Sequence, residues 1–181
     1  TKGSFSFKML PKLVDLNCFG NRFLNDADSL NSAGDVVTAL ESAKSQDGDP
    51  PTIENINYGG TFLGIPSNLE NCTSLRVFNS TDNRGSEDQL VNNSTGTYLF
   101  NNCNALERIS FYRTNLGQIN FPNKFTNPVL SYIDLRYTYI KGGKPGVADA
   151  SQTHVIHADT FEDAPELKNL YILSNKLLSG K

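Results

Sequence analysis

One spaced pattern of apolar residues limits what this chain can fold into. In the segment LPKLVDLNCFGNRF, the pattern is carried by Leu10, Leu13, Leu16, Cys18, Asn21 and Phe23. Their offsets of 0, 3, 6, 8, 11 and 13 residues describe the template L-x-x-L-x-x-L-x-L-x-x-N-x-L. When such a template recurs along a chain, it indicates a fold that is built from stacked structural repeats.

Five more copies of the template follow along the chain. The second comprises Ile53, Ile56, Tyr58, Thr61 and Leu63, and the third comprises Cys72, Leu75, Phe78, Ser80 and Asn83. The fourth comprises Cys103, Leu106, Ile109, Phe111, Thr114 and Leu116, and the fifth Leu130, Ile133, Leu135, Thr138 and Ile140. The sixth comprises Ala164, Leu167, Leu170, Ile172, Asn175 and Leu177. Six copies of one spaced pattern are a far stronger signal than a single short motif.

An apolar residue also precedes most copies of the template. It lies six positions before the first strand leucine at Phe7, Leu69, Phe100 and Phe161, and five positions before Leu130 at Phe125. We expect each of these residues to lie in a short helix or 3₁₀ turn on the convex side, with its apolar edge in the core.

Over nearly its whole length the chain resembles the leucine-rich-repeat family. Its irregular copies, rich in Asn and Tyr, are similar to repeats of bacterial surface proteins and of tailed-phage virion proteins. The segments GIPSNLENCTSLRVF and NKLLSGK resemble the plant extracellular type. The chain departs from the family where Thr61, Thr114 and Thr138 replace the template Asn. The resemblance implies an α/β solenoid with one curved parallel β-sheet and short helical or irregular convex segments.

The pattern predicts one strand from each copy, for example LVDLNCF in the first. We expect the strands to pair in parallel in sequence order, with the template leucines pointing inward and stacking on the next copy. A single copy cannot bury its apolar face alone, so stability is a sum of contacts between neighbours.

The predicted organisation is a single leucine-rich-repeat domain over residues 1–181, with about six repeats. We expect it to be a fragment of a longer chain. Three gaps exceed the repeat length and are predicted insertions near 24–50, 84–99 and 141–160. The first of them contains VVTALESAK, which predicts a short helix.

The residues between the template leucines should face the concave side of the sheet, because successive strand side chains point to opposite faces. The central ones are Asn17, Asn57, Asn79, Ser110, Asp134 and Tyr171. Tyr and Arg gather in the last three copies, and these residue types most often carry interface energy. We therefore predict partner binding by Arg108, Tyr112, Arg113, Tyr132, Asp134, Arg136, Tyr137 and Tyr171. The alternative is that an exposed sheet face simply tolerates these residues.

The expected function is a non-enzymatic binding module that recognises a protein or glycan through the concave face, in adhesion or host-surface recognition. The alternative is a structural building block that contacts neighbouring subunits of a virion or other extracellular assembly. Both imply an extracellular, cell-surface or virion location. No nucleophile or nucleotide-binding motif is present, and we predict neither enzyme activity nor a cofactor.

Composition narrows the range of partners. The net charge of −3 argues against a general nucleic-acid binder, which would need a basic face, and no run of about 18 apolar residues predicts a membrane span. His154 and His157 form an H-x-x-H pair, and 25–28 and 47–49 are acidic turns. An insertion loop and ordinary turns explain these better than metal sites. Cys72 and Cys103 occupy the same template position; we expect buried thiols, with a disulfide as the alternative.

Overall fold

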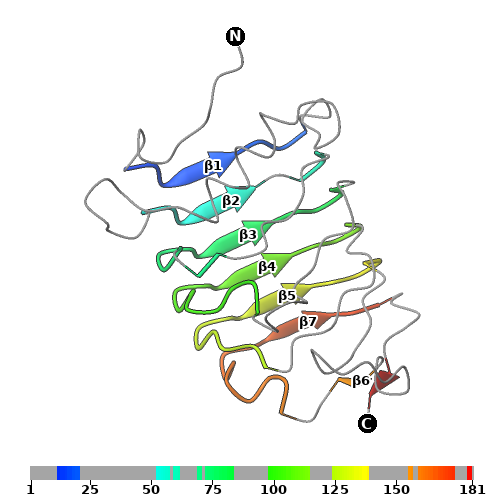
Figure 1. The fold of residues 1–181 in the computed structure, drawn as a ribbon. Helices are drawn as coiled ribbons and strands as arrows, with labels where there is room; N and C mark the ends of the chain where they lie inside the picture. Colours follow the sequence, from blue (N-terminus) through cyan, green and yellow to red (C-terminus); the bar gives the residue numbers. More distant parts are fainter. Residues whose placement is uncertain are drawn as a thin grey trace.

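A six-stranded parallel sheet organises the protein. Its computed structural model describes residues 12–20, 52–57, 59–61, 69–70, 72–83, 98–114, 124–138, 155–156, 159–173 and 179–180. The strands are β1 (Asp15–Asn17), β2 (Asn55–Asn57), β3 (Val77–Asn79), β4 (Arg108–Ser110), β5 (Tyr132–Asp134) and β7 (Asn169–Tyr171). They lie side by side in the order β1-β2-β3-β4-β5-β7, and all point the same way (Figure 1).

The strands pair in one constant register. The residues at the strand centres lie opposite one another in the series Leu16, Ile56, Phe78, Ile109, Ile133 and Leu170. Each is the strand-centre residue of its template copy. The predicted parallel pairing in sequence order is therefore confirmed, although each strand is only three residues long.

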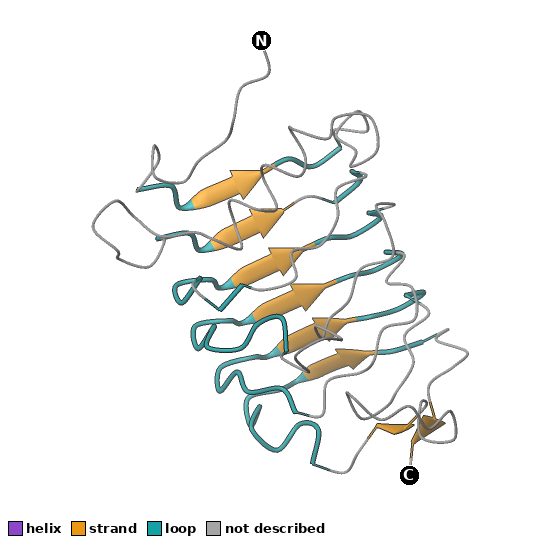
Figure 2. Ribbon diagram, viewed as in Figure 1, coloured by secondary structure: helices purple, strands orange, loops and turns teal. Residues whose placement is uncertain are grey.

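The described residues that flank the strands form turns and irregular loops (Figure 2). Within the described residues there is no helix, and so none there is long and apolar enough to cross a membrane. The predicted helix in VVTALESAK lies outside these residues, as do most of the three predicted insertions. A second, two-stranded parallel sheet pairs β6 (Val155–Ile156) with β8 (Ser179–Gly180), and the sequence analysis did not predict it.

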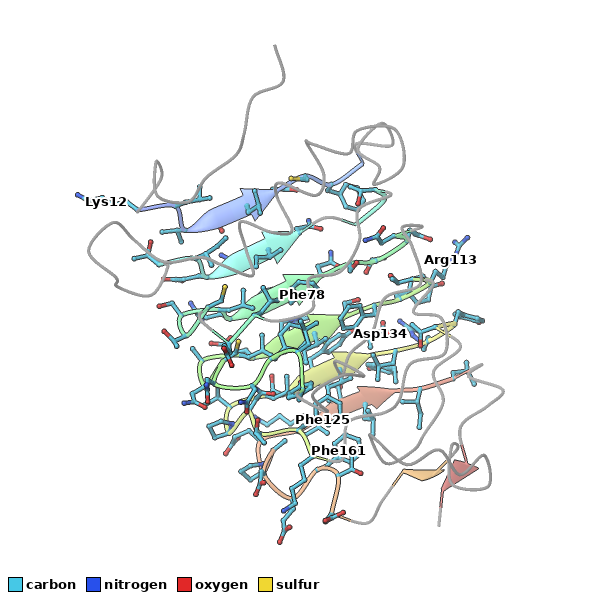
Figure 3. All side chains as sticks on the ribbon, viewed as in Figure 1. Lys12, Phe78, Arg113, Phe125, Asp134 and Phe161 are labelled. Atoms are coloured by element: carbon cyan, nitrogen blue, oxygen red, sulfur yellow. The ribbon has the colours of Figure 1, made fainter. Side chains whose placement is uncertain are left out.

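The core lies against one face of the six-stranded sheet. Its fully buried side chains include Ile56, Phe78, Ile109 and Ile133 from four strand centres. The apolar residues predicted to precede the strands lie there too: Leu69, Phe100 and Phe125 are at most 1% exposed. A row of edge and stacked ring contacts runs through the core, from Phe78 and Phe100 by way of Tyr98 to Phe125 and Phe161; Figure 3 labels Phe78, Phe125 and Phe161.

Single turns, and not helices, explain the three-residue spacing before β3, β4 and β7. Around Phe100, the N–H of Cys103 donates to the Phe100 carbonyl at 3.1 Å, and the N–H of Leu106 donates to the Cys103 carbonyl at 3.1 Å. The same pair of bonds joins Leu69 to Cys72 to Leu75, and Phe161 to Ala164 to Leu167. Each bond closes one i to i+3 turn, so every third residue returns to the core side. Where a short helix or 3₁₀ turn was predicted, the structure thus has successive single turns.

The residue shared by the two successive turns also links the loop before one strand to the loop before the previous strand. The Cys103 thiol donates to the Leu69 carbonyl at 3.2 Å. Asn127, at the equivalent position before β5, is fully buried, and its Nδ2 donates to the carbonyls of Phe100 and Cys103 at 3.1 and 3.0 Å. Buried carbonyls need partners, and here side chains of the next loop supply them. This position therefore contributes hydrogen bonds as well as packing.

Cys18, Cys72 and Cys103 form no disulfide. Cys72 and Cys103 are fully buried, as expected, and burial raises the pKa of the Cys72 thiol to about 12. Burial raises the pKa of Cys103 as well, and the neighbouring Cys72 adds to that rise. Because the thiolate is the reactive form of cysteine, both side chains are protected in the folded chain.

A thiol reagent at pH 8 should distinguish the three cysteines. We expect the partly exposed Cys18 to react first. Cys72 and Cys103 should react at least about a hundredfold more slowly until denaturant is added, since burial blocks access and suppresses the thiolate. Mass spectrometry after timed quenching measures this. Equal labelling of all three in the folded chain, or a mass two hydrogens too low, would contradict the buried free thiols.

Leu135, just after β5, and Leu173, just after β7, test which side of the sheet is buried. Leu135 is 1% exposed, whereas Leu173 is 66% exposed. Leu135→Ala should lower the free energy of unfolding by about 2–5 kcal/mol, because it leaves a cavity in the core. Leu173→Ala should change it by less than about 0.5 kcal/mol. Urea denaturation followed by circular dichroism gives both values, and equal effects of the two substitutions would show that the inward-facing assignment is wrong.

Candidate functional site

The side of the sheet opposite the core carries the predicted binding residues. On β2, Asn55 and Asn57 are half-buried while Ile56 between them is fully buried, and β3 shows the same alternation. On β4 and β5, Arg108, Ser110 and Tyr132 are likewise more exposed than Ile109 and Ile133. We call this side the open face. The predicted facing of the strand residues is confirmed for β2 to β5, whereas all three residues of β7 are exposed.

A polar residue at the third position of most strands ends that strand. The Oδ1 atoms of Asn17, Asn57 and Asn79 accept the N–H two residues further on, at 3.0, 3.2 and 3.0 Å. Asp134 does the same for the N–H of Arg136 at 3.2 Å. These bonds form Asx turns. The Asn residues of the first three strands therefore have a structural role that the sequence analysis did not assign.

Three residues beyond the end of these strands, the backbone enters the left-handed region. Gly20 and Gly60 occupy this position after β1 and β2, with φ of 76° and 66°. Asp82, Arg113 and Tyr137 occupy it after β3, β4 and β5, with φ of 54°, 55° and 59°. Arg and Tyr are unfavourable in this conformation, at a cost of roughly 1–2 kcal/mol compared with a right-handed residue. The chain nevertheless has long side chains at Arg113 and Tyr137, which is the kind of local strain that is concentrated at functional sites.

An ion pair between Asp134 and Arg136 lies at the centre of the open face of β4, β5 and β7. Asp134 is only 3% exposed, although it lies on the open face. The guanidinium of Arg136 donates through Nε to Oδ1 at 2.9 Å and through Nη2 to Oδ2 at 2.6 Å. These hydrogen bonds raise the pKa of Arg136 above its usual value. The Tyr132 hydroxyl also donates to Oδ2, at 3.4 Å. The carboxylate is thus satisfied inside the protein.

Aromatic rings enclose this ion pair on both sides. The Arg136 guanidinium carbon lies 4.9 Å from the centre of the Tyr112 ring and 5.0 Å from that of Tyr171. Tyr112 contacts Tyr137 edge to face at 5.8 Å, and Tyr171 contacts Tyr132 at 5.6 Å. Cation–π and ring contacts of this kind hold the side chains in defined positions.

Seven of the eight predicted binding residues therefore form one connected group. We call it the Tyr/Arg cluster, and its members are Arg108, Tyr112, Tyr132, Asp134, Arg136, Tyr137 and Tyr171. Arg108 joins the cluster through Tyr132, whose ring centre lies 4.3 Å from its guanidinium carbon. The eighth residue, Arg113, lies beyond the end of β4 and is labelled in Figure 3. Its guanidinium pairs instead with Asp82, at 3.2 Å from Nε to Oδ1.

The sequence placed these residues on one face but did not reveal their mutual contacts. Asp134 was predicted to bind a partner, whereas its carboxylate is nearly inaccessible and is engaged with Arg136. Tyr137 and Tyr171 remain the open part of the cluster, at 44% and 39% exposed. These two tyrosines are thus available for contact, and Asp134 orients Arg136 between Tyr112 and Tyr171.

The other sequence candidates do not join this site. His154, His157 and the acidic turns at 25–28 and 47–49 lie outside the described residues. Among the residues that the structure does describe, no three His, Cys, Asp or Glu side chains gather as metal ligands.

Comparison with family models, with curated proteins and with solved structures found no match to this chain. The geometry of the open face is therefore the basis for inferring what the protein does.

Glycine substitutions at left-handed positions can remove a side chain of the open face with little change in the stability of the fold. Tyr137→Gly and Arg113→Gly remove a side chain at a left-handed position, where glycine is the preferred residue. The relief of backbone strain should offset the lost contacts, so the free energy of unfolding should change by less than about 1 kcal/mol. Tyr112→Gly, at an adjacent position without positive φ, should lower it by at least about 1 kcal/mol. Thermal and urea denaturation measure all three; a large loss in Tyr137→Gly would contradict the left-handed turn.

Proposed function

We propose that this chain is a leucine-rich-repeat solenoid segment that works as a non-enzymatic binding module and recognises a protein or glycan through its open face. The observation that carries the proposal is the Tyr/Arg cluster, a preassembled group of aromatic and cationic side chains on a sheet face. The location that fits this function is extracellular, on a cell surface or on a virion.

The repeat class is supported by the agreement between the template and the strand register. Six template copies coincide with six strands whose central residues lie opposite one another. The template's threonine substitutes, Thr61, Thr114 and Thr138, are all at most 2% exposed. Thr114 donates to the carbonyl of Ser80, which belongs to the turn after the preceding strand. These positions behave as equivalent sites in successive turns of one coil, as a solenoid requires.

Binding is supported by the rigidity and composition of the cluster. Arg136 is fixed by Asp134 and by two rings, so little side-chain entropy is lost when a partner covers it. Tyrosine and arginine provide both apolar area and hydrogen-bond donors, and they dominate measured binding hot spots. Tyr137 and Tyr171 offer the exposed area, and Arg136, between the rings of Tyr112 and Tyr171, has its side chain 34% exposed.

Arg136 itself is a poor residue for testing this function. Truncating it would leave the Asp134 carboxylate buried without its partner, which typically costs several kcal/mol of stability. A loss of binding in Arg136→Ala would therefore report unfolding as readily as a lost contact. The exposed tyrosines are the sharper probes.

The test begins with a panel of immobilised glycans and surface proteins, which identifies a ligand for the unmodified chain. Tyr171→Ala and Tyr137→Gly should each weaken the Kd for that ligand by about 5- to 30-fold, equivalent to about 1–2 kcal/mol. The matched control is Phe19→Ala, which removes another exposed aromatic ring (59% exposed) beyond the end of β1. It should leave the Kd unchanged. Calorimetry or surface plasmon resonance supplies the Kd values, with folding checked by circular dichroism.

The second candidate function is a building block of an extracellular or virion assembly. One observation favours it: apolar side chains are exposed on β7, at the edge of the sheet, and two residues beyond its end, with Leu170 at 37% and Leu173 at 66% exposed. If Leu173→Ser abolishes assembly of the parent particle while Tyr137→Gly and Tyr171→Ala do not change any binding, the building-block function replaces recognition.

A further inference from the structure

A hollow lies on the open face beside the Tyr/Arg cluster. Its volume is about 280 Å³, and it spans the outer sides of β3, β4 and β5. The side chains that line it are those of Val77, Asn79, Thr81, Arg108, Ser110 and Tyr132. The hollow exists because small residues on β3 and at Ser110 lie next to the long side chains of Arg108 and Tyr132. It is slightly smaller than pockets for drug-sized ligands, so it suits a single ring-sized group.

Arg108 gives this hollow an unneutralised positive charge. Of the four arginines in the described part of the chain, Arg76, Arg113 and Arg136 each lie within 4 Å of a carboxylate. Arg108 has no such partner among the described residues, and its guanidinium stacks on the Tyr132 ring. The nearby Asp134 does not supply one, since both of its oxygens are bound by Arg136. The stacked guanidinium therefore keeps its hydrogen-bond donors for an external anion.

Polar groups beside Arg108 add donors of the kind that hydroxyl-rich ligands use. The hydroxyls of Thr81 and Ser110 are 2.9 Å apart and share one hydrogen bond, so one hydroxyl hydrogen of the pair remains. Asn79 donates one Nδ2 hydrogen to Asn57 Oδ1 at 3.1 Å and keeps its second. Val77 and Tyr132 supply the apolar part of the lining. An acidic peptide would need larger apolar anchors, whereas a sugar ring needs this mixture of hydroxyl-matching groups and one apolar wall.

We propose that this hollow binds a carboxylated sugar residue of a glycan, with its carboxylate on the Arg108 guanidinium and its hydroxyls toward Asn79, Thr81 and Ser110. The two oxygens of a carboxylate match the two-pronged donor geometry of a guanidinium. The proposal rests on the open face being a binding surface, and it names the ligand class that this surface takes.

Four small probes isolate the chemistry. Methyl glucuronide and methyl glucoside differ only in the carboxylate at C6. Methyl glucoside 6-sulfate replaces the carboxylate by a sulfate, and N-acetylglutamate amide carries the carboxylate without a sugar. Titration of each into the full chain, followed by NMR of the backbone amides, gives Kd values and the location of binding. We expect methyl glucuronide to bind at least tenfold more tightly than the other three, with the largest shifts at Thr81 and Ser110.

Variants of Arg108 complete the test. Arg108→Gln should weaken methyl glucuronide binding at least about tenfold and leave it no tighter than methyl glucoside, and Arg108→Lys should restore only part of the difference because lysine has no fork. Arg76→Gln, which alters an exposed arginine outside the hollow, should change nothing. Equal binding of glucuronide and glucoside, tighter binding of the sulfate, equal binding of the glutamate probe, or an unaffected Arg108→Gln would each overturn the proposal.

The test of the sugar site and the test of the proposed function can fail independently of each other. If Tyr137→Gly and Tyr171→Ala weaken the panel ligand but methyl glucuronide does not bind, recognition through the cluster stands and the sugar site is wrong. If methyl glucuronide binding depends on Arg108 but the tyrosine variants bind the panel ligand normally, the sugar site stands and recognition through Tyr137 and Tyr171 is wrong.

Discussion

The constant register of the parallel strands is the constraint on which the rest of the structure depends. Because the strand-centre residues lie opposite one another, β2 to β5 all contribute one face to the core and the other to the open face. A shift of one residue in any strand would exchange its two faces. Hydrogen bonds before and after the strands reinforce this register. Before the strands, side chains such as Asn127 join one turn to the next. After the strands, the N–H groups of Arg113 and Tyr137 donate to carbonyls in the loop that follows the neighbouring strand.

The same register creates the Tyr/Arg cluster. It brings the end of β5 between the ends of β4 and β7, so Arg136 lies between Tyr112 and Tyr171. The Asp134–Arg136 pair then removes a negative charge from the face, and the positive charge of Arg108 remains beside it. A buried ion pair of this kind contributes little net stability, because desolvation opposes the Coulomb attraction. Its consequence here is positional: it fixes the direction of a guanidinium and of the rings around it.

Much of this arrangement could be predicted from the sequence, because spacing alone determines which residues share a face. The strand positions, the inward apolar residues and the burial of Leu69, Phe100 and Phe125 all followed from the template. The pairing of the Asp134 carboxylate with Arg136 could not be predicted, since it depends on side-chain conformations across neighbouring strands. The Asx turns were also missed, although Asn at the ends of three strands was a visible signal. The pairing of β6 with β8 has no periodic pattern to reveal it, because each strand has only two residues.

The most direct test of this account is the solvent exchange of the arginine Nε–H protons, measured by NMR on the unliganded chain. Arg136 donates its Nε–H to Asp134 between two rings, so its proton should exchange slowly and its guanidinium should show restricted rotation. The Nε–H of Arg108 has no carboxylate partner among the described residues and should exchange faster. Tyr112→Leu should accelerate the exchange of Arg136 without affecting Arg76. If Arg136 exchanges as fast as Arg108 in the unmodified chain, the open face has no preassembled cluster and the account is wrong.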